Sequence, residues 1–392
     1  MNQPRRTTLL AVLAVSALAL LAAACVPITA PPPTPPPPPP GSPTLTFNKS
    51  FVTNVAQPWD IAFAPDGTML YTEKGGALWS FAAGGIKKQL GMVTGSVVNG
   101  EGGLLGLAVD PNFASNHFVY VCTTTAVPDN RIVRLTVDLT APANAGITAQ
   151  AAVVTGMTRA GVHNGCRVRF QPGTSDLFWS MGDAAAATLP QDLTSMNGKI
   201  LRGQVTNGNV APHPGNPNPA TYVFTYGHRN PQGLAFNPNL SNTPYSVEHG
   251  SNVDDEVNKL TVGANAGRDP NNGAGGYDDS QPMTDFVKFP SAIAPVWKSA
   301  NNRTIAPSGA TFIENIAGMN WGSWNGALIL AVLKDAELRL LMMNPNGTVA
   351  SESQVAGSTT IRLRSVVQSP VDGRLYVAED ANPGRIWQIT PS

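Results

Sequence analysis

The stretch "FAPDGTMLYTEK", from Phe63 to Lys74, joins a proline-containing turn to an alternating apolar strand. Looser copies of this pattern recur along the rest of the chain, at intervals close to the length of one four-stranded sheet with its loops. The copies are "VDPNFASNHFVYVC" (109–122), "FQPGTSDLFWSMGD" (170–183), "FNPNLSNTPYSVEHG" (236–250), a degenerate "GATFIENIAGMNWGSWNGALILAVL" (309–333) and "QSPVDGRLYVAED" (368–380). A repeated supersecondary unit therefore dominates the fold.

Between these copies the chain consists of short runs rich in Val, Ile, Leu, Tyr and Thr, broken by Gly, Pro and Asn. Such runs are typical of strands, and helical periodicity is scarce. Six sheet-sized repeats without helices favour a β-propeller over a sandwich. We expect an all-β fold over residues 45–392: a six-bladed β-propeller of four-stranded antiparallel blades, with ligands on the loops over its central channel.

The N-terminus has the pattern of an export signal. Arg5 and Arg6 precede an apolar run from Leu9 to Leu21, and small residues follow it up to Cys25. We expect a signal peptide over residues 1–24, a lipidated Cys25 that begins a proline-rich linker over residues 25–44, and attachment to the cell envelope. The alternative is plain secretion or a periplasmic location.

Lysine plus arginine and aspartate plus glutamate number 25 each. This balance lacks the basic surface of a nucleic-acid-binding protein, so we expect no nucleic-acid partner, and contact with a membrane through Cys25 only. Cys122 and Cys166 remain in the expected mature chain. In an oxidising compartment they could form a disulfide, and their spacing leaves that question open.

His163 in "HNGCRVRF" and Asp183 in "SMGDA" are separated by one strand and its return. At that separation the two can form a hydrogen-bonded pair, in which the carboxylate fixes the histidine tautomer and makes the free nitrogen more basic. The pair is a candidate general base, and a structural histidine is the alternative. The sequence has neither a G-x-S-x-G serine nor an H-E-x-x-H motif, so the common hydrolase signatures are missing.

Two glycine-containing loops carry further polar groups. "GHRNPQG" (227–233) places Arg229, Asn230 and Gln232 between apolar strand edges, and Pro231 marks it as a turn. "GEGGLLGL" holds Glu101 among glycines that let the backbone approach a ligand, although a tight entry turn explains it as well.

Charged residues gather in two more places. "EHGSNVDDEVNKL" (248–260) offers acidic oxygens that suit calcium, and solvated acids are an equal alternative. Arg362 and Arg364 in "IRLRSV", together with Lys334, supply cations. Two arginines two residues apart repel each other unless an anion lies between them, and surface arginines on an edge strand are the alternative.

In chain order, these motifs resemble those of the soluble pyrroloquinoline-quinone-dependent aldose and glucose dehydrogenases, over roughly residues 50–390. The matching motifs are "PWDIAFAPDG", "GEGGLLGLAVDPNF", "HNGCRVRF", "MGDA", "GHRNPQGLAF", "EHG…DDEVN", "IAPSG", "LK" and "RLRS". Each motif is weak by itself, whereas the full set in this order is specific. The resemblance implies a six-bladed propeller that binds pyrroloquinoline quinone and Ca²⁺.

The resemblance also implies a reaction. His163, oriented by Asp183, would take the proton of the anomeric hydroxyl of an aldose, while the C1 hydride passes to the quinone and a lactone forms. Arg229 would stabilise the oxygen charge that develops on the quinone. Electrons would leave later to an external quinone, dye or redox protein.

Further roles carry over residue by residue. The residues implied to bind the cofactor are Glu101, Leu189, Arg229, Asn230, Gln232, Thr304, Lys334, Arg362 and Arg364. The residues implied to hold calcium are Gly250 and Ser251, through their carbonyls beside the cofactor, and Asp255 and Glu256 at a second, structural site. The three carboxylates of the quinone would supply the anion that Arg362 and Arg364 require.

Three positions depart from the family pattern. Glu101 stands where sugar-oxidising members often have glutamine, Ala266 replaces a tyrosine near the calcium site, and Asn302 replaces an aromatic residue. The sugar preference therefore does not transfer. Two alternatives remain open: a non-catalytic propeller that binds carbohydrate or protein, and a calcium-dependent lactonase.

Overall fold

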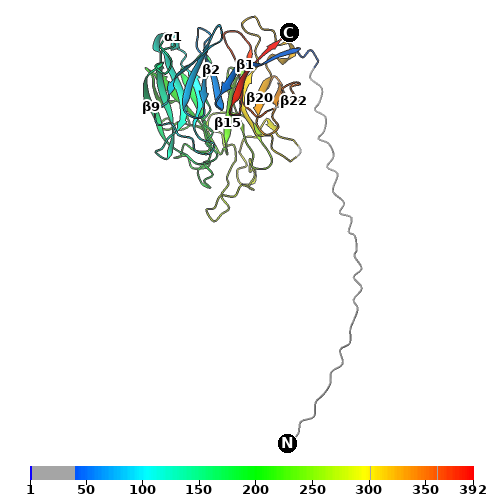
Figure 1. Ribbon diagram of the computed structural model, residues 1–392. Helices are drawn as coiled ribbons and strands as arrows, with labels where there is room; N and C mark the ends of the chain where they lie inside the picture. The colour runs from blue at the N-terminus through cyan, green and yellow to red at the C-terminus, as the bar shows by residue number, and fades with distance from the viewer. Residues whose placement is uncertain (2–39, 301, 360) are drawn as a thin grey trace. The chain divides into compact units, whose positions relative to one another are not determined.

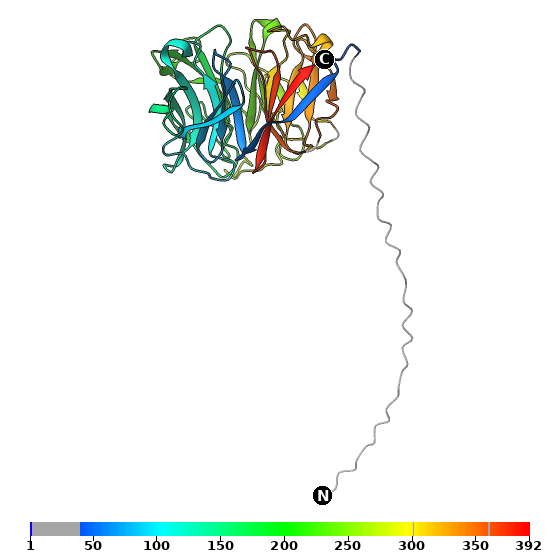
Figure 2. The ribbon, with the colours of Figure 1, turned by 45° about the horizontal axis from the view of Figure 1, so that its top comes forward.

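The structure is a computed structural model that describes Met1 and residues 40–300, 302–359 and 361–392. The expected signal peptide, Cys25 and most of the proline-rich linker lie outside the described residues. Within the unit Pro36–Ser392, six small antiparallel sheets stand in a ring (Figures 1 and 2), which confirms the six-bladed β-propeller. In the described residues we find no helix long and apolar enough to cross a bilayer.

The blades follow one another in chain order. Blade 1 contains β2 (Pro58–Phe63), β3 (Met69–Glu73), β4 (Ala77–Ala82) and β5 (Ile86–Met92), and blade 2 contains β6 (Leu104–Val109), β7 (Phe118–Thr124), β8 (Asp129–Val137) and β9 (Ile147–Thr158). Blade 3 contains β10 (Val168–Phe170), β11 (Asp176–Met181), β12 (Lys199–Thr206) and β13 (Asn209–Pro212), with β14 (Val223–Tyr226) as an additional partner of β12.

Blade 4 contains β15 (Pro231–Asn237), β16 (Thr243–Glu248), β17 (Glu256–Lys259) and β18 (Trp297–Lys298), and blade 5 contains β19 (Pro307–Phe312), β20 (Leu328–Val332), β21 (Leu338–Met343) and β22 (Val349–Gln354). Blade 6 contains β23 (Leu363–Gln368), β24 (Leu375–Glu379), β25 (Gly384–Pro391) and β1 (Leu45–Val55). The N-terminal strand β1 thus completes the last blade, and Figure 2 shows it in blue beside the red strand β25.

Each sequence repeat forms the turn between the first and second strands of one blade. The short helix α1 (Phe113–Asn116) and the 3₁₀ turns η1 (Pro238–Leu240) and η2 (Gly322–Trp324) lie in these turns. The first strands contact one another around the ring, as β15 and β19 do, so they line its centre. Because the strands within a blade are antiparallel, every first strand begins on one face, the entry face, and the repeat turns lie on the opposite face.

The core is divided among the blade interfaces. Six hydrophobic clusters occur in the described residues, and each fills the space between two neighbouring blades. Cys122 of β7 and Cys166 before β10 form a disulfide, with Cα atoms 5.6 Å apart, which resolves the pairing that the sequence left open and joins blades 2 and 3.

A buried carboxylate joins the blades at the centre. Asp60 of β2 is fully buried, and it accepts hydrogen bonds from both guanidinium nitrogens of Arg169 and from the Leu107 N–H of blade 2. It also contacts Arg167, at 2.5 Å, and accepts the Ser365 hydroxyl of blade 6, at 3.0 Å. Burial raises the pKa of Asp60, but the charges of Arg167 and Arg169 outweigh burial and lower it.

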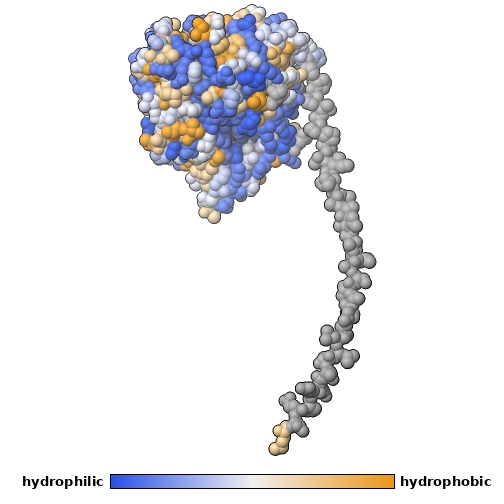
Figure 3. Space-filling view, viewed as in Figure 1, coloured by the Kyte–Doolittle hydropathy of each residue, from blue (hydrophilic) through white to orange (hydrophobic). Residues whose placement is uncertain are grey.

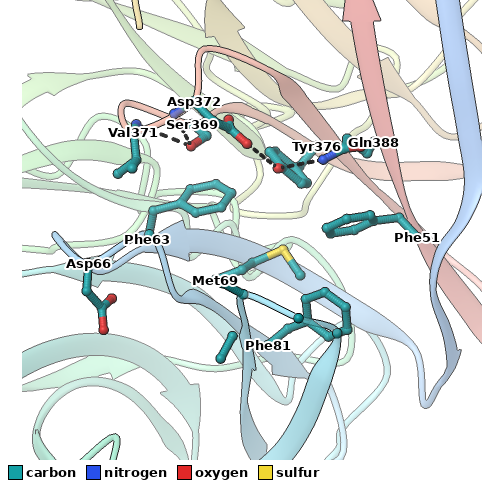
Figure 4. A pocket seen from close by; sticks show the side chains of 15 residues that line it. Phe51, Phe63, Asp66, Met69, Phe81, Ser369, Val371, Asp372, Tyr376 and Gln388 are labelled. Atoms are coloured by element: carbon teal, nitrogen blue, oxygen red, sulfur yellow. Dashed lines mark hydrogen bonds between the residues drawn. The ribbon is translucent and has the colours of Figure 1, made fainter.

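A pocket of about 510 Å³ lies between blades 6 and 1, on the face that carries the repeat turns (Figure 4). Aromatic rings from four strands line it: Phe51, Phe63, Phe81 and Tyr376. The molecular surface in Figure 3 is mainly hydrophilic, with small separate apolar patches. Since the sequence-predicted site residues lie at the other end of the strands, this pocket is separate from the candidate active site.

Candidate active site

The predicted site residues come together because each blade presents the same strand ends. Glu101, Arg229, Asn230 and Thr304 precede the first strands of their blades, and Asp183 follows a second strand. All of these positions are on the entry face. In Figure 1 the yellow-green loops of blade 4 project from this face, on the side away from α1.

His163 and Asp183 form the predicted pair. Nδ1 of His163 lies 2.7 Å from Oδ1 of Asp183, and both side chains are buried. Because an ionised carboxylate only accepts hydrogen bonds, Nδ1 carries the proton and Nε2 is the basic nitrogen. The His163 backbone has φ 55°, and Cys166, held by the disulfide, has φ 72°. The sequence thus places the imidazole on a short segment tied to the neighbouring blade.

Glu101 connects this pair to the "GHRNPQG" loop. Its Oε2 accepts the backbone N–H of His163 at 2.8 Å and the side-chain amide of Asn230 at 3.2 Å. The Asn230 carbonyl oxygen accepts the N–H of Gly165 at 3.1 Å. Residues from blades 2, 3 and 4 are therefore hydrogen-bonded to one another around the imidazole.

Arg229 is almost completely buried beside the same pair. Its carbonyl accepts the Asp183 N–H at 2.7 Å, and its own N–H donates to Glu248 at 2.9 Å. Its guanidinium is paired through Nε and Nη2 with Asp279, at 2.8 Å each. The backbone of Arg229 thus fixes Asp183, while its side chain is held by a loop that the sequence prediction did not include.

Gln232 and the predicted arginines meet on the far side of the channel. Arg364 donates to the Gln232 side-chain oxygen at 2.5 Å and to Asp380 at 3.0 Å, and Arg362 reaches the same oxygen of Asp380 at 3.2 Å. The anion expected between the two arginines is thus Asp380 in this structure. Lys334 donates to the Thr304 hydroxyl at 3.1 Å, which brings those two predicted residues together.

Two of the arginines act on a buried histidine of the site. Burial, and then the cations Arg364 and Arg229, lower the pKa of His249 to about 3. Within the described part of the chain, His249 Nε2 and Arg364 Nε are buried without a hydrogen-bond partner. Arg364 Nε is a donor, and since buried polar groups are normally satisfied, an orphaned donor on a guanidinium fits an anionic ligand such as a quinone carboxylate.

The predicted calcium residues behave differently from one another. The carboxylate of Asp255 accepts the backbone N–H groups of Gly250 (2.9 Å), Ile305 (2.5 Å) and Ala306 (3.0 Å), so it already serves as a clamp between loops. Ser251 lies half-buried next to Gly250. As a structural clamp, Asp255 has little capacity left for a metal ion.

Glu256 fits a cation better. It pairs in register with Glu248 on the neighbouring strand, and Asn258 donates to both carboxylates. Burial, and then the charge of Glu248, raise the pKa of Glu256 to about 8. In the residues that the structure describes, no three acidic, histidine or cysteine side chains group as a metal centre. A calcium ion at Glu256 would therefore take further oxygens from amides or backbone carbonyls.

Comparison with known proteins now identifies the family. Residues 55–388 match the sequence profile of the glucose/sorbosone dehydrogenases. The chain belongs to this family. The aldose sugar dehydrogenase YliI of Escherichia coli is 29% identical, over 85% of this chain and 90% of that protein. An uncharacterised Synechocystis protein is 30% identical, over 86% and 85%.

Solved structures of aldose sugar dehydrogenases agree with this assignment. The PQQ-bound aldose sugar dehydrogenase of Streptomyces coelicolor superposes with a TM-score of 0.73, at 29% identity, and covers 91% of this chain and 100% of its own. The apo form of the E. coli soluble aldose sugar dehydrogenase has a TM-score of 0.75 at 26% identity, over 89% and 100%. The protein is thus an oxidoreductase of the sugar dehydrogenase class.

In this glucose/sorbosone dehydrogenase, the structure adds residues that the sequence prediction missed. Tyr277 donates its hydroxyl to Asp183 at 3.0 Å, and Asp279 and Asp380 hold the predicted arginines. Asp380 had a usable signal, because several repeats end in an acid at the end of the second strand, as Asp183 and Glu248 also do. Leu189 lies half-buried in the loop after β11, and its carbonyl accepts from Lys199 at 2.7 Å.

Proposed function

We propose that this protein oxidises the C1 hydroxyl of aldose sugars to the lactone, with pyrroloquinoline quinone as cofactor and calcium as its metal. The observation that carries the proposal is the location of the His163–Asp183 pair on the same face as three cations, one of which, Arg364, has an orphaned donor at Nε. A neighbouring structure is described as PQQ-bound, and a 27% identical relative of Acinetobacter calcoaceticus as a quinoprotein glucose dehydrogenase.

The protein's own groups suit the removal of a proton and a hydride from one carbon. Asp183 fixes the proton on Nδ1 of His163, so Nε2 accepts the proton of the anomeric hydroxyl. When bound, pyrroloquinoline quinone supplies the acceptor for the C1 hydride. The sugar thereby loses one hydride and one proton, which balances the oxidation of a hemiacetal to a lactone.

The remaining residues would hold the cofactor in place. Lys334, Arg362 and Arg364 would bind its carboxylates, with Thr304 beside Lys334. Asn230 and Gln232 would donate to ring oxygens. Arg229 is buried next to the imidazole and would place positive charge where negative charge develops on the quinone oxygen.

Reconstitution with the quinone tests this function. We expect the protein with pyrroloquinoline quinone and Ca²⁺ to reduce a dye in the presence of aldoses, and Arg364→Met to raise the Kd for the quinone roughly 10- to 100-fold, because a charge-assisted hydrogen bond is lost. The Kd is measured by fluorescence titration. Arg374→Met, in a repeat turn on the opposite face, is the matched control and should bind normally.

Other results would redirect the assignment. Quinone binding without aldose oxidation would favour non-sugar alcohols as substrates. A protein that binds no quinone would leave a propeller with a binding role, and lactone hydrolysis with calcium alone would favour a lactonase.

The pH dependence of stability tests the calcium assignment. Because the pKa of Glu256 is about 8 when folded and 4.5 in the ordinary carboxyl, the unfolded chain releases the proton first. Metal-free protein therefore loses stability as pH rises from about 4.5 to 8. In EDTA at pH 8 we expect Glu256→Gln to melt at least about 5 °C above the parent, and near pH 4.5 to match it.

Calcium should reverse this order at pH 8. The parent binds the ion through the ionised carboxylate and gains stability by mass action, whereas Glu256→Gln does not respond. Melting temperatures with and without CaCl₂ give the result. A parent protein that does not respond to calcium at pH 8 would rule out Glu256 as a ligand.

A further inference from the structure

A buried arginine organises the loop of residues 269–282 on the entry face. Arg268 is fully buried, and its Nη1 donates to the carbonyls of Gln281 and Pro282. Its Nη2 donates to Asp279 at 2.9 Å, and its guanidinium lies 5.8 Å from the Tyr277 ring. The cation thus holds the end of the loop and turns Asp279 toward the channel.

Asp279 bridges two arginines from different loops, Arg229 and Arg268. Its Oδ1 accepts from Arg268 Nη2 and from Arg229 Nε, and its Oδ2 accepts from Arg229 Nη2. The contact with Arg229 is therefore bidentate along one edge of the guanidinium, which fixes its plane. Nη1 of Arg229 lies outside this edge and donates a long hydrogen bond, of 3.3 Å, to the His249 carbonyl. Nη1 is thus left for a ligand in the channel.

The positive charges of Arg229 and Arg268 also require the carboxylate of Asp279 as their counter-charge. Arg229 is almost completely buried and Arg268 is fully buried, and both contact Asp279. Without Asp279 the two guanidiniums would face each other with no counter-charge, and a buried charge that loses its partner is costly. Burial raises the pKa of Asp279, but the hydrogen bond and charge of Arg229, and then the charge of Arg268, outweigh burial and lower it. The acid therefore stays ionised at neutral pH.

The same loop contacts the base. The Tyr277 hydroxyl donates to Asp183 Oδ2 at 3.0 Å and lies 3.4 Å from Asp279 Oδ1. Asp183 in turn holds His163. The loop that Arg268 anchors thus contacts two groups of the site: Asp183, which holds the imidazole, and the guanidinium of Arg229.

We propose that Asp279 is the positioning residue for Arg229, and that Arg268 keeps Asp279 in the position this requires. The role rests on the proposed function, because Arg229 is expected to act on the quinone oxygen. In this role Asp279 acts through Arg229. It fixes the orientation of the guanidinium so that Nη1 faces the channel before the ligand arrives.

The test compares Asp279→Asn with Asp279→Glu and with Asp278→Asn. Asp278 is the matched control, because it is an acid of the same loop that accepts hydrogen bonds from Ser280 and Gln281 and forms no ion pair with an arginine of the described residues. In the reconstituted enzyme we expect Asp279→Asn to lower kcat roughly 10- to 100-fold, with the quinone Kd and sugar KM within about threefold of the parent. Asp279→Glu should recover most of the kcat, and Asp278→Asn should leave it unchanged.

A second readout uses the quinone-free protein. We expect the Arg229 Nε–H proton, observed by NMR and assigned with Arg229→Lys, to exchange with water at least about tenfold faster in Asp279→Asn than in the parent or Asp278→Asn. The exchange rate can be measured even if the parent oxidises no sugar. Failure of the proposed function can therefore be distinguished from failure of this inference. A kcat within threefold of the parent in Asp279→Asn, or unchanged exchange at Arg229, would overturn the positioning role.

Discussion

Replacing His163 with alanine is expected to lower kcat for aldose oxidation by roughly 10²- to 10⁴-fold, the usual contribution of a positioned general base. The variant loses the imidazole, whose Nδ1 lies 2.7 Å from Asp183, while the cations that would bind the quinone are untouched. The quinone Kd should therefore stay within about threefold of the parent. Single-turnover reduction of bound quinone by sugar, followed by absorbance, measures the step directly.

The chain contains a matched control for this experiment. His213 pairs with Asp176 through Nε2, at 3.2 Å, on the opposite end of blade 3. His213→Ala removes a histidine–aspartate pair of the same kind at a distance from the channel, and its kcat should equal that of the parent. If both variants lose activity to the same extent, the His163 effect is a general loss of structure and the base assignment fails.

The largest loss of stability is expected from Asp60→Ala. The substitution leaves Arg167 and Arg169 in the centre of the ring without their carboxylate, and breaking a buried ion pair costs about 3–5 kcal/mol. For a domain of this size, the melting temperature should fall by about 4–7 °C. Because the pKa of Asp60 is lowered by these arginines, its contribution is present above the ordinary aspartate pKa and is lost as pH falls below it.

Asp254→Asn is the comparison for Asp60. Asp254 pairs with Lys298 at 3.0 Å where both side chains are more than a third exposed, so solvent screens the charges and the loss should cost about 1 kcal/mol or less. Thermal denaturation at pH 7 distinguishes the two. If the melting temperatures of both variants fell equally, the central ion cluster would contribute no more to stability than an exposed ion pair.

The sequence predicts the blades well because their signal is local. Each repeat, such as Phe63–Lys74, contains its own turn and the beginning of the second strand, so six blades can be counted without any distant contact. The pairing of β1 with β25 and the additional strand β14 could not be predicted in the same way. Their partners are set by tertiary contacts, and no short-range pattern marks them.

The same distinction applies to the site. The return of one strand brings His163 to Asp183, and their spacing in the sequence indicated that the two could pair. Asp279, by contrast, is brought to Arg229 by a loop without strand periodicity, whose course depends on the buried Arg268. Asp380 meets Arg364 through the end of β24, which the repeat pattern indicates but which the sequence prediction did not use.

The joining of β1 to β25 has a consequence for how the protein is made. β1 is among the first strands to leave the ribosome, yet its partner lies at the C-terminus: Leu45 pairs with Pro391, and Val55 with Gly384. Five blades can form as the chain lengthens, but the sixth waits for the final residues. During synthesis β1 is an unpaired edge. A chain truncated just before β25 would keep that edge permanently, and would be prone to pair with other chains.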